Sequence, residues 1–399
     1  MHSRRDFLRN TCLLPFAPAF GACAANAARR DADAPRASHG RILVVVELNG
    51  GNDGVNTVVP HRDPGYEQLR SALRLPRTEL FALDDELGLH PSLRGFKELF
   101  DAGQLAVVQG AGYPEPNLSH DTSMAIWHTA RRDRAGRTGT GWIGRVFDRD
   151  DPHTSSMPGA VLVGPHAPPA ALRGRRFTAA AVPTIEEFLA AGDLAERMLP
   201  ASDAGSPLGR HLDRTIASTR TTTAALRRVV DSAPASTAYP DGKLAHDLRL
   251  ASSLIRAGFD ASVYYAIQTG YDTHSLQLEP HARRLQELGD SLVAFFTDLR
   301  DARLDERVTV LVFSEFGRRA AENASRGTDH GTSGPVFLAG PGVRGGVFGR
   351  TPSLSDLVDD NLTMSVDFRR IYAAVLRDWL ARDPVAVLGD GFEPLALFA

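Results

Sequence analysis

Carboxylate and imidazole side chains stand directly after apolar runs at several places in this sequence. Glu315 follows the run 308–313, and Asp272 and His274 follow the run 262–268. Such β-branched runs are typical of buried parallel strands, whose carboxyl ends meet at one edge of a sheet and form its binding sites. We therefore expect these side chains to converge. A cluster of this composition is what a hydrolytic site with one or two metal ions requires.

The first apolar run, 42–48, ends in the glycine-rich loop 49–54. Its glycines allow a close backbone approach to a ligand, and Asn52 and Asp53 supply oxygen atoms. Asn52 is a candidate substrate-binding residue. The same composition is also that of an ordinary tight turn. Both interpretations stay open.

Ser119 and His120 follow another predicted strand, 105–109, at the start of a predicted helix. Unpaired N–H groups and the helix dipole favour negative charge at such a position, including a developing phosphate or sulfate oxyanion. Ser119 is therefore a candidate nucleophile, and His120 beside it is a second candidate catalytic residue. The alternative for Ser119 is a helix N-cap.

Asp329 and His330 precede the apolar run 335–339, so the loop 317–334 must fold back for them to reach the same edge. Arg318 lies in this loop, and its planar fork matches the geometry of a phosphate or sulfate group. Arg318 is thus a candidate for binding the substrate anion. The alternative is an ion pair with a neighbouring carboxylate.

The composition of the chain argues against one class of partner and limits the side chains that can bind a metal. A formal net charge of −3 gives no basic footprint, which argues against nucleic acid as a partner. Both cysteines, Cys12 and Cys23, lie in the N-terminal leader. A metal in the rest of the chain must therefore be held by carboxylate, imidazole, hydroxyl or amide groups, which suit Zn, Mn, Mg or Ca.

Residues 1–27 have the pattern of a twin-arginine export signal, with Arg4 and Arg5 before an apolar stretch that is too short to span a membrane. We expect the twin-arginine translocase as a partner, a periplasmic or secreted location, and a mature protein without a transmembrane segment. Lipid anchoring through Cys23 is disfavoured by the residues before it. Residues 28–40 are predicted to be a disordered tether.

The alternation of strand and helix patterns predicts an α/β fold, with a mostly parallel central sheet and helices on both faces. We expect a single domain over residues 41–399. Residues 150–236 lose the alternation and contain helical pieces. They are interpreted as a helical insertion that shapes access to the site.

Several motifs resemble the domain of unknown function 1501 family. They are ELNGGNDGVNTVVP, NLSHDTSMAIW, GYDTHSLQ, FSEFGRRAAENASRGTDHG and GGVFG, together with the leader. That family is similar to the alkaline phosphatase and sulfatase superfamily. The resemblance implies an alkaline-phosphatase-like sheet between helices and a two-metal ester hydrolase site.

The resemblance also implies roles for individual residues. Ser119 stands in the place of the superfamily nucleophile, and the loop after the first strand holds a metal carboxylate, Asp53 or else Asn49 or Asn52. Further metal positions match Asp272, His274, Glu315 and His330, with Asp329 beside His330. Phe316 replaces a superfamily histidine, and Asp272 and His274 are closer in sequence than is usual, so the second metal is in doubt. His120 could substitute for the missing histidine.

The sequence thus favours an exported metal-dependent hydrolase of phosphate or sulfate esters, acting on a small-molecule or glycan ester. The alternative is a catalytically inactive, metal-stabilised binding or assembly protein of the cell envelope on the same fold. A metal-dependent mutase or other transferase would share the same site.

Overall fold

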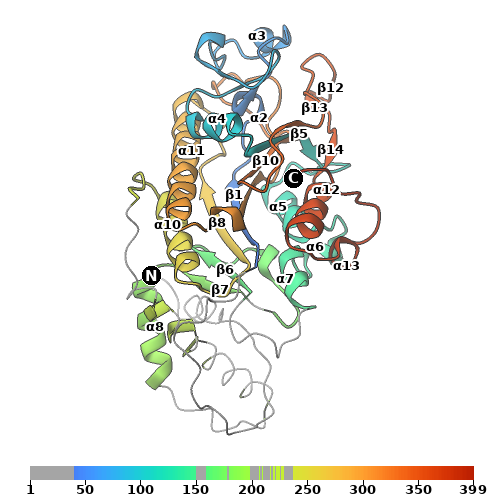
Figure 1. The fold of residues 1–399 in the computed structure, drawn as a ribbon. Coiled ribbons are helices and arrows are strands. Elements are labelled where there is room, and N and C mark those ends of the chain that lie inside the picture. Colours follow the sequence, from blue (N-terminus) through green and yellow to red (C-terminus); the bar gives the residue numbers. More distant parts are fainter. Residues whose placement is uncertain are drawn as a thin grey trace, which may run out of the picture.

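A computed structural model describes residues 40–149, 159–177, 179–197 and 237–399, with scattered positions between 206 and 228. Within these ranges the chain forms a nine-stranded sheet between two layers of helices (Figure 1). The strand order is β11-β5-β10-β9-β1-β8-β6-β7, and β14 also pairs with β5. The predicted fold class, a mostly parallel sheet flanked by helices on both faces, is confirmed.

The centre of the sheet is β1 (Ile42–Asn49), which pairs in parallel with β8 (Val263–Thr269) and β9 (Val308–Ser314). Side chains alternate between the two faces of a strand, and both faces are buried here. Val44 belongs to one hydrophobic core and Val45 to the other. This is why these strands read as continuous apolar runs.

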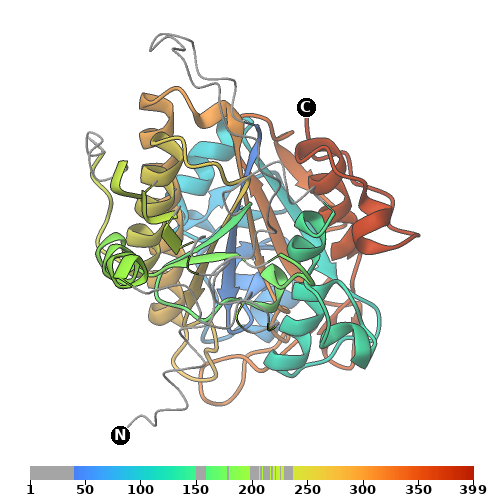
Figure 2. The ribbon, with the colours of Figure 1, turned by 90° about the horizontal axis from the view of Figure 1, so that it is seen from below.

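Each face of the sheet is covered by its own helices (Figure 2). On one face, apolar side chains of α4 (Arg94–Asp101), α10 (Lys243–Arg256) and α11 (Leu278–Asp301) share a core with the sheet. The other face is covered by α5 (His120–Thr129), α7 (Trp142–Phe147), α12 (Phe368–Ala374), the π-helical turn Val375–Trp379 and α13 (Pro384–Leu388).

Strand β10 (Gly334–Ala339) runs antiparallel to both of its neighbours, β9 and β5 (Leu105–Gly112). Its beginning therefore lies at the edge where the parallel strands end. The loop before β10 reaches that edge because of the strand direction. The sequence indicated a mostly parallel sheet but did not identify this reversal.

The interpretation of residues 150–236 as a helical insertion needs a correction. Within the described residues, β6 (Ala160–Val163) and β7 (Ala180–Val182) are strands that pair in parallel and extend the central sheet beyond β8. The helical residues of that described part are α8 (Ile185–Arg197), a 3-10 turn at Ala170–Leu172 and scattered positions between 209 and 228. Runs of four and three apolar residues are too short for periodicity to reveal a strand.

Shorter elements complete the described chain. β11 (Gly346–Phe348) and β14 (Val366–Asp367) pair in parallel with β5. The remaining elements include a hairpin, a three-stranded sheet and short helical turns: β12 (Leu357–Val358), β13 (Asn361–Leu362), β2 (Val58–Val59), β3 (Phe81–Ala82), β4 (Gly88–Leu89), α2 (Gly54–Thr57), α3 (Gly65–Leu69), α6 (Arg134–Arg137), and 3-10 turns at Arg77–Glu79, Ala170–Leu172 and Asp305–Arg307.

The predicted export signal, residues 1–27, and the tether up to residue 39 lie outside the described residues. Among the helices that the structure describes, none combines the length and the apolar character needed to cross a membrane.

Candidate metal centre

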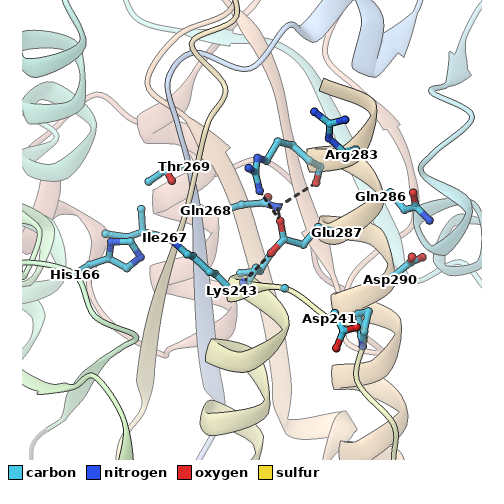
Figure 3. Close-up of a pocket in the computed structure, with 14 residues that line it drawn as sticks. His166, Asp241, Lys243, Ile267, Gln268, Thr269, Arg283, Gln286, Glu287 and Asp290 are labelled. Carbon is cyan, nitrogen blue, oxygen red and sulfur yellow. Dashed lines mark hydrogen bonds and ion pairs between the residues drawn. The ribbon is translucent and has the colours of Figure 1, made fainter. Parts of the chain in front are cut away.

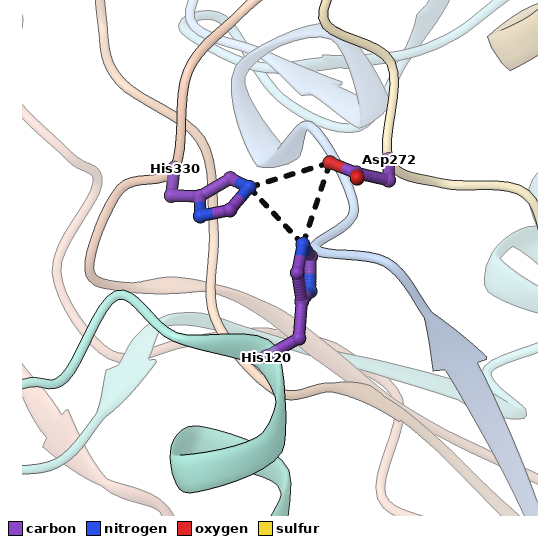
Figure 4. Close-up of side chains that lie close together, drawn as sticks. All are labelled: His120, Asp272 and His330. Atoms are coloured by element: carbon purple, nitrogen blue, oxygen red, sulfur yellow. Dashed lines mark hydrogen bonds and ion pairs between the residues drawn. The ribbon is translucent and has the colours of Figure 1, made fainter.

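Three of the predicted site residues converge at the carboxyl edge of the sheet (Figure 4). The Nε2 atoms of His120 and His330 lie 3.0 Å apart. Asp272 Oδ1 lies 3.4 Å from His120 Nε2 and 3.3 Å from His330 Nε2. One ligand atom from each residue thus faces a common point, which is the arrangement expected of a metal site.

His274 adds a fourth donor to this group. Its Nε2 atom lies 2.9 Å from His330 Nε2 and 3.0 Å from Asp272 Oδ1. His274 and Asp272 are about half exposed, with side-chain exposures of 44% and 49%. The cluster is therefore open to solvent and to a substrate on this side.

The fold brings these residues together from three places in the sequence. Asp272 and His274 follow β8, His120 is the first residue of α5, and His330 lies in the loop before β10. The loops are joined by backbone hydrogen bonds, including Thr328 N to Thr273 O at 3.1 Å. Gly50 has a φ of 124°, and a Cβ there would overlap the Asp272 backbone nitrogen. The glycine-rich loop thus allows a close approach to the Asp272 loop.

The outer ring nitrogen of each histidine has its own hydrogen-bond acceptor. His330 Nδ1 lies 2.7 Å from the Leu118 carbonyl oxygen, and His120 Nδ1 lies 2.7 Å from Glu315 Oε1. His274 Nδ1 lies 3.2 Å from an Asp329 carboxylate oxygen. A neutral imidazole that donates from Nδ1 presents an unprotonated Nε2. Such outer partners are typical of metal-binding histidines.

His120, Asp272 and His330 fit three corners of a tetrahedral divalent cation site. With metal–ligand bonds of about 2.0–2.1 Å, neighbouring ligand atoms of a tetrahedral zinc site are about 3.3 Å apart. The three ligand atoms lie 3.0 to 3.4 Å from one another. His274 Nε2 is equally close to His330 and Asp272 but does not belong to the group of atoms that includes His120. Three imidazoles and one carboxylate suit Zn²⁺ among the metals expected from the sequence.

Glu315 and Asp329 were predicted as metal ligands, but the structure places them behind the histidines. Glu315 is fully buried. Its Oε1 atom accepts hydrogen bonds from His120 and from Gly50 N at 3.0 Å, and its Oε2 atom accepts one from Ser314 Oγ at 2.8 Å. Asp329 accepts from His274 and from Asn323 Nδ2 at 3.2 Å. Both carboxylates therefore orient histidines of the cluster.

Asp53 was also predicted as a metal ligand, and the structure does not bring it into the cluster. Its buried carboxylate pairs with Arg70 at 2.6 and 3.0 Å and accepts a hydrogen bond from Gln277. Burial raises the pKa of Asp53, but the Arg70 guanidinium outweighs this effect and lowers the pKa from 3.8 to about 2. Asp53 also caps α2 through Asn56 N. The loop was interpreted either as part of a binding site or as an ordinary tight turn. For Asp53 the structure supports the second interpretation, because its side chain makes structural contacts.

Asn52, a predicted substrate-binding residue, is buried beneath the same loop. Its Oδ1 atom accepts from Thr57 Oγ1 at 3.0 Å and lies 2.9 Å from His281 Nε2. Asn49, the remaining alternative in this loop, donates to Glu47 Oε1 at 3.0 Å. Neither side chain lies among the converging donors.

Arg318 was predicted to clamp the substrate anion, and the structure gives it a different position. Its buried guanidinium donates to the backbone carbonyls of Gly50, Gly51 and Thr328, and to Asp272 Oδ1 at 2.6 Å. The alternative, an ion pair with a neighbouring carboxylate, is what the structure shows. Arg318 fixes Asp272 in place. Because these contacts occupy the buried fork, it is not retained as a substrate clamp.

Ser119 lies at the N-cap position of α5, directly before His120. Its backbone N–H donates to Asn117 Oδ1 at 2.9 Å, but its side chain makes no capping hydrogen bond. The residue is exposed. Ser119 is therefore the N-cap residue by its backbone position, as the alternative predicted. Its hydroxyl group does not cap the helix.

Two of the cluster residues have shifted pKa values. The hydrogen bond to Glu315 raises the pKa of His120 above its ordinary value of 6.5. Burial raises the pKa of Asp272, but the bonded Arg318 guanidinium outweighs it and lowers the pKa from 3.8 to about 2. Asp272 is thus an anion at neutral pH, whereas His120 must lose its proton before it can bind a metal.

Two cavities lie near the carboxyl edge of the sheet. One, of 510 Å³, lies between the start of α10 and α11 (Figure 3). Its Glu287 is already bound by Arg284, Gln268 and the backbone of Leu244. The other, of 550 Å³, is lined by Leu118 and by Thr332, on the two segments that carry His120 and His330.

The sequence analysis missed several residues that shape this edge. Arg70, which neutralises Asp53, lies in no recognisable motif, and a pairing between distant residues has no local signal. The Leu118 carbonyl that holds His330 is a backbone group and is invisible to a search by residue type. Glu315 was predicted as a metal ligand, and His120 as a catalytic residue that could also substitute for the missing histidine. In the structure His120 faces the cluster and Glu315 lies behind it.

The family model described as "Protein of unknown function (DUF1501)" matches residues 41–378, and the chain belongs to this family. The family predicted from the motifs is therefore confirmed. A search of curated proteins found no match.

Several solved structures match the chain at low sequence identity and low TM-score. The PsFucS1 sulfatase from Pseudoalteromonas sp. matches with 11% identity and a TM-score of 0.39, over 85% of this chain and 67% of that one. The C-terminal periplasmic domain of EcEptC from Escherichia coli, in complex with Zn, has 8% identity and a TM-score of 0.33, over 76% and 74%. Alkaline phosphatase from the Antarctic bacterium TAB5 has 11% identity and a TM-score of 0.29, over 78% and 95%.

Proposed function

We propose that this protein is a metal-dependent hydrolase of phosphate or sulfate esters with Ser119 as its nucleophile. The observation that carries the proposal is the convergence of His120 Nε2, His330 Nε2 and Asp272 Oδ1 next to the start of α5, with His274 Nε2 beside the last two. His120, Asp272, His274 and His330 would hold one divalent cation, for which Zn²⁺ is our first choice. Among the described residues, a single group of this kind is present.

A divalent cation at this position would act as a Lewis acid toward an ester oxygen and favour the ionised form of a nearby hydroxyl group. The protein's own residues prepare the reaction. Glu315, Asp329 and the Leu118 carbonyl orient the three imidazoles. Arg318 keeps Asp272 ionised and in place.

Ser119 would supply the attacking oxygen. Its Oγ atom forms a bond to phosphorus or sulfur, the bond from that atom to the alcohol oxygen breaks, and the serine proton passes to solvent. Water then cleaves the seryl ester and restores the hydroxyl group. The N-terminus of α5, with its unpaired N–H groups, favours the anionic substrate next to Ser119.

A second candidate function is a metal-stabilised binding protein of the cell envelope. It is favoured by Arg318, whose buried guanidinium binds protein carbonyls and Asp272 and so offers no ready clamp for a substrate anion. On this proposal the cation has four protein ligands and serves stability.

Hydrolysis of 4-nitrophenyl phosphate and 4-nitrophenyl sulfate tests the two proposals against each other. The hydrolase proposal expects turnover that chelation removes and Zn²⁺ restores, and that the Ser119→Ala variant lacks while it still binds the metal. Metal-loaded wild-type protein without turnover on either ester series would favour the binding protein.

Export remains part of the proposal. The leader, residues 1–27, would direct the chain through the twin-arginine translocase to the periplasm or the medium. Replacing Arg4 and Arg5 by lysine should keep the chain in the cytoplasm, as cell fractionation would show. Export that continues unchanged would contradict this route.

A further inference from the structure

Tyr113 follows β5 directly, and its buried hydroxyl group closes the loop that leads to Ser119. The hydroxyl group accepts a hydrogen bond from Asn117 N at 3.0 Å. It donates to Ser123 Oγ at 2.9 Å, and the Asn117 carbonyl lies 3.3 Å away as a second acceptor. The residue is 2% exposed, and its ring packs edge-on against Phe368. The Tyr113 hydroxyl group therefore has a fixed place between the loop and α5.

The loop that this hydroxyl group holds carries two groups of the candidate site. Asn117 Oδ1 accepts a hydrogen bond from Ser119 N at 2.9 Å. The Leu118 carbonyl lies 2.7 Å from His330 Nδ1. A displacement of the loop would therefore move Ser119 and the hydrogen-bond acceptor of His330 together.

The backbone of the loop adopts a strained conformation that needs support. Glu115 has a φ of 52°, in the left-handed region that few residues other than glycine adopt. It lies between Pro114 and Pro116, and a following proline restricts the backbone of the residue before it further. Such a conformation persists only where its surroundings fix it. The contacts of the Tyr113 hydroxyl group with Asn117 close the loop around Glu115 and so provide this support.

The Tyr113 hydroxyl group is also connected to the group behind His120. Ser123 Oγ, which accepts from Tyr113, donates to Glu315 O at 2.6 Å. The Glu315 carboxylate in turn lies 2.7 Å from His120 Nδ1. If Ser123 is replaced by alanine, the Tyr113 hydroxyl group can donate to the Asn117 carbonyl instead, and the loop stays closed.

We propose that Tyr113 is a positioning residue of the candidate site. Its hydroxyl group holds the segment 117–119 in the place where Ser119 can attack a bound ester and the Leu118 carbonyl can orient His330. The role of Ser119 as nucleophile rests on the proposed hydrolase function. Tyr113 is not among the converging donors, and it acts through the loop.

The Tyr113→Phe variant tests this role, because it removes one oxygen atom and leaves the ring in place. Asn117 N loses its acceptor, so we expect faster hydrogen exchange of the segment 117–119, measured by mass spectrometry on the full-length protein. In the zinc-loaded protein, kcat for the 4-nitrophenyl esters should fall by about 10–100-fold, since a small misplacement of reacting groups has an effect of that size. KM should change by less than about twofold, as expected when an interaction of the transition state alone is lost.

Tyr66→Phe, in α3, is the matched control. The Tyr66 hydroxyl group likewise accepts from a backbone N–H, that of Leu75 at 3.0 Å, and donates to a buried side chain, Asn56 Oδ1, at 3.0 Å. Tyr66 is 3% exposed, so the two variants remove equivalent hydrogen bonds from equally buried rings. We expect both variants to lose a similar amount of stability in urea, while Tyr66→Phe keeps the wild-type kcat and the wild-type exchange of the segment 117–119.

Asn117→Ala is a second variant that leaves the Tyr113 hydroxyl group and its contacts with the backbone of residue 117 in place. It removes only the side-chain acceptor of Ser119 N, and it should also lower kcat. Wild-type kcat in Asn117→Ala would contradict the coupling of Tyr113 to Ser119 through this residue.

An unchanged kcat in Tyr113→Phe, or an equal fall of kcat in Tyr66→Phe, would overturn the positioning role. Unchanged hydrogen exchange of the segment 117–119 in Tyr113→Phe would overturn it as well. If the zinc-loaded wild-type protein hydrolyses neither ester, the hydrolase function fails instead. The hydrogen exchange of the segment 117–119 then decides by itself whether Tyr113 holds this segment.

Discussion

The Nε2 atoms of His120 and His330 lie 3.0 Å apart, although the outer nitrogen of each ring already faces an acceptor. Glu315 Oε1 is the hydrogen-bond partner of His120 Nδ1, and the Leu118 carbonyl is that of His330 Nδ1. Asp272 Oδ1 lies 3.4 and 3.3 Å from the two Nε2 atoms. Once both Nε2 atoms are unprotonated, a cation bound between them and Asp272 would remove their mutual repulsion.

The outer carboxylate behind His120 should tune metal affinity. Glu315→Gln keeps the shape of the side chain but loses the charge that holds the Nδ1 proton. Because outer partners of this kind typically contribute about 10–100-fold to metal affinity, we expect a Zn²⁺ dissociation constant higher by about that factor, measured by competition with a chromogenic chelator. Glu98→Gln, at an exposed position on α4, is the control. Unchanged affinity in Glu315→Gln would show that Glu315 does not support a ligand.

The hydroxyl group of Ser119 should be needed for turnover and not for the metal. Ser119→Ala should lower kcat for 4-nitrophenyl esters by at least about 10³-fold, as expected when a nucleophile is removed. The variant should retain its metal, because Ser119 is not among the converging donors. Ser123→Ala tests a buried serine of the same helix that donates to Glu315 O, and we expect it to retain most of the activity. Full activity in Ser119→Ala would exclude the serine as nucleophile.

The buried pair of Asp53 and Arg70 should stabilise the fold. Asp53→Asn leaves the Arg70 guanidinium buried without its counterion, which typically costs about 3–5 kcal/mol in the free energy of unfolding. Urea denaturation at neutral pH measures the change. The exposed pair of Glu67 and Arg74 gives a matched control, since breaking such a pair typically changes the free energy by less than about 1 kcal/mol. Equal effects of Asp53→Asn and Glu67→Gln would contradict this assignment.

The same pair should make stability depend on pH in the acid range. The pKa of Asp53 is lowered to about 2 in the folded chain from an ordinary value of 3.8. The stabilisation, about 2 kcal/mol, is fully present above the unfolded pKa and is lost as the pH falls through the folded pKa. The free energy of unfolding of the wild type should therefore fall more steeply between pH 4 and 2 than that of Asp53→Asn (window from about 3.8 down to about 2). Parallel pH profiles would contradict the prediction.

Much of the sheet could be predicted because its strands are continuous apolar runs. The predicted strand 42–48 is observed as Ile42–Asn49, and the predicted strand 308–313 as Val308–Ser314. Strand ends were less accurate, since the predicted strand 105–109 is observed as Leu105–Gly112. The strands β6 and β7 were missed because they are too short for a periodic signal.

The candidate site was predicted as a set of residues, but their roles were not. Adjacent polar residues at the end of a strand differ in direction, and that direction depends on tertiary contacts. Glu315 points into the protein toward Gly50 N and His120, whereas Asp272 points toward the open side. The carboxylate of Asp53 pairs with Arg70, a residue that belongs to none of the motifs. Residue type and strand position predict which residues lie at the carboxyl edge of the sheet. Contacts with residues far away in sequence determine which of these side chains point toward the candidate metal centre.

Elemental analysis of the purified mature protein tests the metal centre most directly. The wild type and the His246→Ala control, which changes an exposed histidine on α10, should each carry one divalent cation per chain. His330→Ala should carry substantially less. Equal metal content in His330→Ala and the wild type, or no metal in any of the three proteins, would contradict the proposed centre.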